Sequence, residues 1–60
     1  MNASEIKKIR QKLGLTQECF APLIGVSFQT INRWERGINK PSRLALEKLK
    51  TLDIKEDENA

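Results

Sequence analysis

Five side chains within the stretch GVSFQTINRWERG have the chemistry and spacing of a recognition surface. At about 100° per residue of helix, they fall on one continuous face. They are Phe28, Gln29, Asn32, Arg33 and Arg36. Carboxamides donate and accept hydrogen bonds together, and a guanidinium offers parallel donors. Ile31 and Trp34 fall on the other side of the same helix and form its predicted buried stripe.

Side chains of these types read base-pair edges in the major groove of DNA. Gln or Asn matches N6 and N7 of adenine, Arg matches O6 and N7 of guanine, and an exposed Phe contacts a thymine methyl group. The alternative is a polar face that only keeps the protein soluble. Lys and Glu would serve that purpose better, and this face contains neither while it exposes Phe28. We therefore interpret the predicted helix 28–36 as a recognition helix.

Four predicted helices position this face. Apolar spacing and turn residues place them at about residues 4–13, 17–24, 28–36 and 43–51. No alternating β-branched run predicts a strand. The expected fold class is all-α, a compact bundle of four helices, or of five if the C-terminal residues add one. Its helix-turn-helix would span about residues 17–36.

The predicted turn between the second and third helices is short. Only Gly25, Val26 and Ser27 join them, and such a three-residue connection containing Gly is typical of a helix-turn-helix. Thr16 and Ser27 stand where N-caps are needed. The small side chain of Ala21 would let the two helices approach closely.

Charge is unevenly distributed along the 60 residues, whose net charge is +3. Residues 1–50 carry ten Lys or Arg and four Asp or Glu, whereas residues 51–60 carry one and four. We expect a DNA-binding domain at 1–52 and an acidic, disordered tail at 53–60. A basic body suggests a polyanionic partner, although charge alone equally fits an ordinary solvated surface.

Several classes of function are disfavoured. The chain has no His and a single cysteine, Cys19, which leaves no disulfide and no Cys/His metal site. We find no acid–base pair and no phosphate-cradling glycine loop, so we expect no enzyme, no cofactor and no small-molecule substrate. No apolar run approaches about 18 residues, and the N-terminus lacks a secretory signal. A cytoplasmic location is expected.

The run LGLTQECFAPLIGVSFQTINRWERG closely resembles the helix-turn-helix of the Cro/phage-repressor (XRE-like) family. The family pattern of Gln, Ala, Gly and an apolar residue appears as Gln17, Ala21, Gly25 and Ile31. The resemblance extends over about residues 6–52. It implies a lambda-repressor-like bundle and a transcriptional regulator that binds specific sequences of double-stranded DNA.

The resemblance also implies roles for individual residues. Base-facing positions would be Phe28, Gln29, Asn32 and Arg33, with Gln29 and Arg33 as the principal readers. Phosphate-contacting positions would be Gln17, Arg36, Lys40 and Arg43. Arg10 and Glu35 match an ion pair that ties the first helix to the third in some relatives.

Two features depart from the family and leave alternatives open. Cys19 replaces a frequent acidic residue, so the second helix lacks a capping box. The C-terminal DIKEDENA is too short and charged to supply a convincing fifth helix for a dimer contact. A homodimer and a larger regulatory partner both stay open. So does a second class of function, a small antitoxin or protein-interaction adaptor that uses Phe28 as an anchor.

Overall fold

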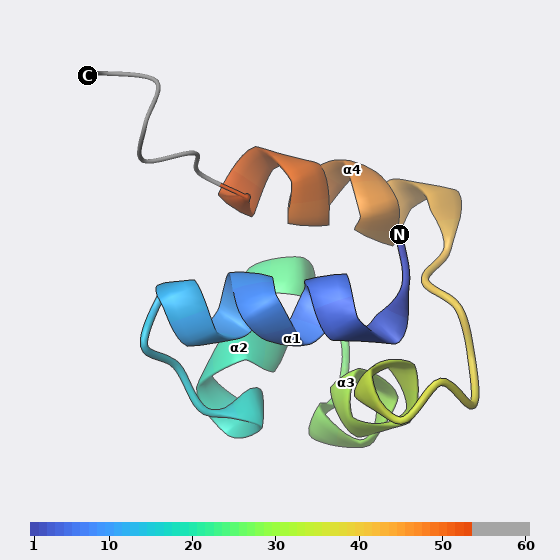
Figure 1. The fold of residues 1–60 in the computed structure, drawn as a ribbon, viewed down its shortest axis with the longest axis horizontal. Coiled ribbons are helices and arrows are strands. Elements are labelled where there is room, and N and C mark those ends of the chain that lie inside the picture. Colours follow the sequence, from blue (N-terminus) through green and yellow to red (C-terminus); the bar gives the residue numbers. More distant parts are fainter. Residues whose placement is uncertain (54–60) are drawn as a thin grey trace.

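Residues 1–53 fold into a bundle of four helices (Figure 1). The computed structural model describes residues 1–53. Its helices are α1 (Ala3–Lys12), α2 (Gln17–Ile24), α3 (Phe28–Glu35) and α4 (Arg43–Leu52). No strand occurs in this part of the chain, so the all-α prediction is confirmed. Of the expected tail at 53–60, Asp53 is described and is the C-cap of α4, while the rest of the tail and the optional fifth helix lie outside the described residues.

Helix ends differ slightly from the predictions. Helix α1 begins at Ala3 instead of Ser4, because Asn2 acts as its N-cap. The Asn2 side chain accepts a hydrogen bond from the Glu5 backbone N–H at 2.9 Å, and Glu5 accepts one from the Asn2 backbone at 2.8 Å. This reciprocal capping box is worth about 1 kcal/mol or more. Helix α3 ends at Glu35 instead of Arg36, which is its C-cap.

The three later helices also have N-caps whose side chains accept hydrogen bonds from backbone N–H groups of the first turn. Thr16 accepts from the Cys19 N–H at 3.1 Å, and Ser27 accepts from the Thr30 N–H at 3.3 Å. Ser42 does the same for α4. Each cap gives a hydrogen-bond partner to a backbone N–H that the helix itself leaves unpaired.

All four helices contribute to one core. The largest fully buried side chains come one from each helix; they are Ile6, Phe20, Ile31 and Leu49. Helix α1 packs against α3 and α4, and α2 packs against both α3 and α4. Leu13, the C-cap of α1, is only partly buried because it lies past the last helical turn.

The turn between α2 and α3 is fixed from two sides. Gly25 adopts φ +85°, a left-handed conformation that Gly takes without steric cost. Its N–H and that of Val26 both donate to the Ala21 carbonyl, at 2.9 and 3.1 Å. From α4, Lys48 Nζ donates to the Ile24 carbonyl at 3.4 Å. The two bonds to Ala21 set the direction in which α3 leaves α2.

Candidate nucleic-acid interface

The outward face of α3 forms a shallow hollow on the protein surface. The five side chains singled out in the sequence all line it, together with one more from the following loop: Phe28, Gln29, Asn32, Arg33, Arg36 and Ile38. Phe28 is 41% exposed. On the other side of the helix, Ile31 and Trp34 are buried in the core. This anchoring holds α3 so that its polar face points to solvent.

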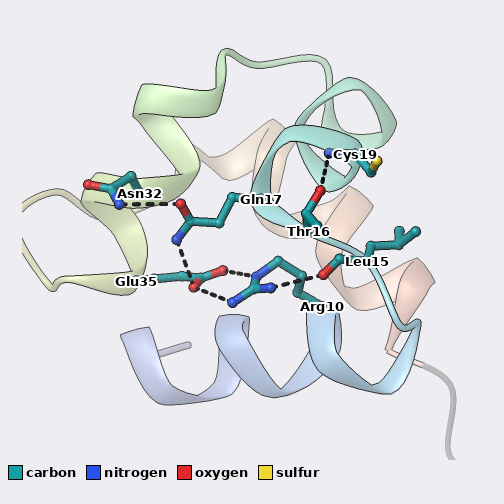
Figure 2. Close-up of polar contacts among 7 residues, drawn as sticks. All are labelled: Arg10, Leu15, Thr16, Gln17, Cys19, Asn32 and Glu35. Atoms are coloured by element: carbon teal, nitrogen blue, oxygen red, sulfur yellow. Dashed lines mark hydrogen bonds and ion pairs between the residues drawn. The ribbon is translucent and has the colours of Figure 1, made fainter.

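A polar network behind this face ties α1, α2 and α3 together (Figure 2). Arg10 donates from Nε to Glu35 Oε2 at 2.6 Å and from Nη2 to Oε1 at 3.0 Å. Its remaining nitrogen, Nη1, donates to the Leu15 carbonyl at 2.9 Å. The Glu35 side chain is only 4% exposed and that of Arg10 is 15% exposed. The ion pair is therefore shielded from solvent and bidentate, which favours a defined geometry.

Gln17 extends this network to the outward face of α3. Its Nε2 donates to Glu35 Oε1 at 3.1 Å, and its Oε1 accepts from Asn32 Nδ2 at 3.2 Å. Gln17 and Asn32 are both half-buried. Gln17 thus braces the third helix, and one N–H of its carboxamide remains for another acceptor such as a phosphate.

This geometry places a solvent-facing α3 directly after a tight turn from α2. The amino-acid sequence matches the helix-turn-helix family of Cro and phage-repressor (XRE-like) proteins over residues 6–58. The chain belongs to this family. Searches of curated proteins and of solved structures each returned no match.

Proteins of this helix-turn-helix family bind DNA and are generally not enzymes. In residues 1–53 no helix is long and apolar enough to cross a membrane. The same part of the chain holds no cluster of acidic or Cys side chains able to bind a metal ion.

The four cationic side chains predicted to contact DNA lie in two different places. Arg33 and Arg36 line it and are exposed. Lys40 and Arg43 are exposed too, but they lie outside it, in the α3–α4 loop and at the first position of α4. Lys40 instead lines a separate cleft that also includes Trp34. The predicted base-facing residues thus converge, whereas these two predicted phosphate contacts stand apart from them.

Burial and the network act on the ionisation of Glu35 in opposite directions. Burial alone would raise its pKa, but hydrogen bonds from Arg10 and Gln17 and the charges of Arg10 and Lys7 lower the pKa below its ordinary value. The hydrogen bond to Glu35 raises the pKa of Arg10, against an opposing effect of burial. The pair is consequently ionised at neutral pH.

Ile38 was missed by sequence reasoning. It is 57% exposed and joins Phe28 in the hollow. Its N–H donates to the Arg33 carbonyl at 2.9 Å, and the Gly37 N–H donates to the Trp34 carbonyl at 3.1 Å. This pair of bonds is the Schellman ending of a helix, which is commonly followed by an apolar residue. The signal was the dipeptide of Gly37 and Ile38 directly after the third helix.

Cys19 lies exposed on α2 as a free thiol, away from the hollow. Its backbone N–H is satisfied by Thr16 even though the acidic partner of a capping box is missing. No contact described in residues 1–53 gives its side chain a role.

Proposed function

We propose that this chain is a transcriptional regulator that binds specific sequences of double-stranded DNA, with α3 inserted in the major groove. One observation carries the proposal. The hollow on α3 brings together two carboxamides, two guanidiniums and two apolar side chains, with no acidic side chain among its lining residues. Base edges present matching donors, acceptors and thymine methyl groups.

The proposed contacts divide into two kinds. Gln29, Asn32 and Arg33 would form hydrogen bonds with base edges, and Phe28 with Ile38 would contact thymine methyl groups. Phosphate contacts would set the register of the protein on the duplex. The proposed phosphate-contacting residues are Gln17, Arg36, Lys40 and Arg43.

Residues 1–52 would act as the DNA-binding domain. We propose that it performs no enzymatic reaction, needs no cofactor or small-molecule substrate, and acts in the cytoplasm. If two copies pair, they would occupy two half-sites about one helical turn apart, roughly 34 Å. A single copy or a heteromeric partner would instead read one short site.

A second candidate function rests on the apolar part of the hollow. Phe28 and Ile38 are exposed at 41% and 57%, and exposed apolar side chains of this size can anchor a protein partner. A small antitoxin or adaptor would use them in that way. The two arginines beside them favour the polyanion instead, so DNA remains our proposal.

Selection from a random duplex pool tests the proposal. The chain is mixed with duplexes, bound DNA is recovered over several rounds, and the enriched sequence is titrated with salt. We expect one enriched site and a strong decrease of affinity with salt, because phosphate contacts release counterions. An unenriched pool with only weak, salt-sensitive binding contradicts the proposal and favours the protein-partner function. A near-palindromic site would indicate a dimer, and one short site a monomer.

A further inference from the structure

The polar network has a fixed direction of hydrogen-bond donation. An Arg side chain only donates, and an ionised carboxylate only accepts. Glu35, already paired with Arg10, must therefore receive the Nε2 end of the Gln17 carboxamide, and the two atoms lie 3.1 Å apart. The oxygen end of Gln17 then faces Asn32 and can only accept.

The direction of donation also fixes the orientation of Asn32, on the outward face of α3. Because Gln17 Oε1 accepts, Asn32 must present Nδ2 to it, at 3.2 Å. Asn32 Oδ1 then points away from Gln17, as Figure 2 shows. Asn32 also lines the hollow, and its Oδ1 has no hydrogen bond to any group in residues 1–53. An oxygen acceptor of known orientation is thus available to a ligand in the hollow.

We propose that Gln17 is a positioning residue that holds the Asn32 carboxamide with its oxygen toward DNA. As a result, the protein selects a base with an amino group at this position, adenine or cytosine, over a base with a keto oxygen, guanine or thymine. The inference rests on the proposed function, and it adds a rule for one position of the target.

The chemistry of base edges explains the selection. Adenine and cytosine offer amino hydrogens in the major groove, which Asn32 Oδ1 accepts. Adenine also offers N7 to the second N–H of Nδ2, so it is the preferred base. Guanine O6 or thymine O4 would instead lie against Asn32 Oδ1, and two acceptor oxygens repel each other. A freely rotating carboxamide could turn over to meet them, but turning here breaks the bond to Gln17 and sets two oxygens against each other.

A binding experiment separates this role from a plain structural one. The Asn32→Ala variant first identifies the base pair that Asn32 contacts within the selected site. Dissociation constants are then measured for the four possible base pairs there, with wild type and with Gln17→Met. The Met side chain keeps the volume and leaves the Arg10–Glu35 pair in place. Lys48→Met is the matched control, since it removes a half-buried polar contact, the bond to Ile24, outside the network.

We expect wild type and Lys48→Met to favour amino-bearing bases by roughly tenfold over keto-bearing bases. In Gln17→Met the preference should fall to about threefold or less. Losing a phosphate contact or some stability would weaken binding to all four duplexes alike and leave their ratio unchanged. Wild type that has a selected site but binds the four duplexes equally overturns the inference, as does Gln17→Met with the wild-type ratio.

A second measurement needs no DNA. NMR of the free protein follows the two side-chain amide hydrogens of Asn32. In wild type we expect one of them to be protected from hydrogen exchange, and in Gln17→Met both should exchange as in an exposed Asn. Equal exchange in the two proteins overturns the positioning role. If wild type selects no DNA at all, both the proposed function and the base preference at Asn32 are wrong. The NMR result still decides whether Gln17 orients Asn32.

Discussion

Arg10 in α1 and Glu35 at the end of α3 form a bidentate ion pair across 25 residues of sequence, with Nε to Oε2 at 2.6 Å. The pair joins α1, which precedes the helix-turn-helix, to α3. The Glu35 side chain is only 4% exposed, so its charge depends on this partner. Stability and the orientation of α3 are therefore coupled at one contact.

Replacing Arg10 should expose that dependence. Arg10→Met leaves a shielded carboxylate without its main partner, which should cost about 3 kcal/mol and lower the melting temperature by more than about 10 °C. Circular dichroism melts at neutral pH provide the measurement. Lys8→Met, at an exposed position of the same helix, is the control and should change stability by less than about 0.5 kcal/mol. Equal melting of the two variants would contradict a stabilising role for the pair.

Acid should weaken the fold through Glu35. Its pKa is lowered in the folded state, so the stabilisation is fully present above the unfolded value of about 4.3 and is lost as pH falls through the lower folded value. Glu35→Gln lacks this titration. The difference in unfolding free energy between wild type and Glu35→Gln should stay constant from about pH 7 to 5 and shrink below that range. Urea titrations at several pH values measure it, and a constant difference down to pH 2 would be inconsistent with the lowered pKa.

Phe28 and Ile38 should make binding sensitive to thymine methyl groups. Replacing a contacted thymine by deoxyuridine removes only the methyl group, and each lost methyl should weaken binding by about 0.8 kcal/mol, roughly fourfold. Fluorescence anisotropy on the selected site provides the dissociation constants. In the double variant Phe28→Ala/Ile38→Ala, deoxyuridine should no longer weaken binding, whereas in Lys40→Ala it should weaken binding as in wild type. A double variant as sensitive to deoxyuridine as wild type would remove both residues from the base contacts.

Arg33 and Lys40 should behave differently when each is changed to Ala. Arg33→Ala should cost about 1–3 kcal/mol on the selected site and relax the preference at one base pair. Lys40→Ala should weaken all sequences alike and reduce the salt slope by about one. Binding to matched and scrambled duplexes across a salt series distinguishes them. If Arg33→Ala weakens both duplexes equally, Arg33 contacts the backbone and does not read a base.

Local rules were sufficient for most of the fold. Thr16 and Ser27 cap their helices, and Gly25 turns the chain, because each depends only on neighbours in the sequence. The capping box of Asn2 and Glu5 is equally local and could have been predicted from their spacing in the sequence, but it was not. The resemblance to a known family supplied the pairing of Arg10 with Glu35, which no periodicity encodes.

Contacts that depend on the angle between helices were not predictable in this way. The bond between Gln17 and Asn32 exists only because α2 and α3 cross at one angle, and this also makes Asn32 half-buried although its helical position alone indicated a freely exposed side chain. Ile38 enters the hollow through the loop after α3, beyond the reach of a helical projection.

The core, with one fully buried side chain from each helix, also determines what can be exchanged between relatives. A peptide containing only α2 and α3 would lose the packing of Ile6 and Leu49, so we expect it not to fold by itself. A chimera that carries new residues only at the outward positions of α3 keeps every core contact. We therefore expect that changes at a few outward positions of α3 alter the target preference and leave the fold intact, whereas α2 and α3 moved alone lose the core contacts of Ile6 and Leu49.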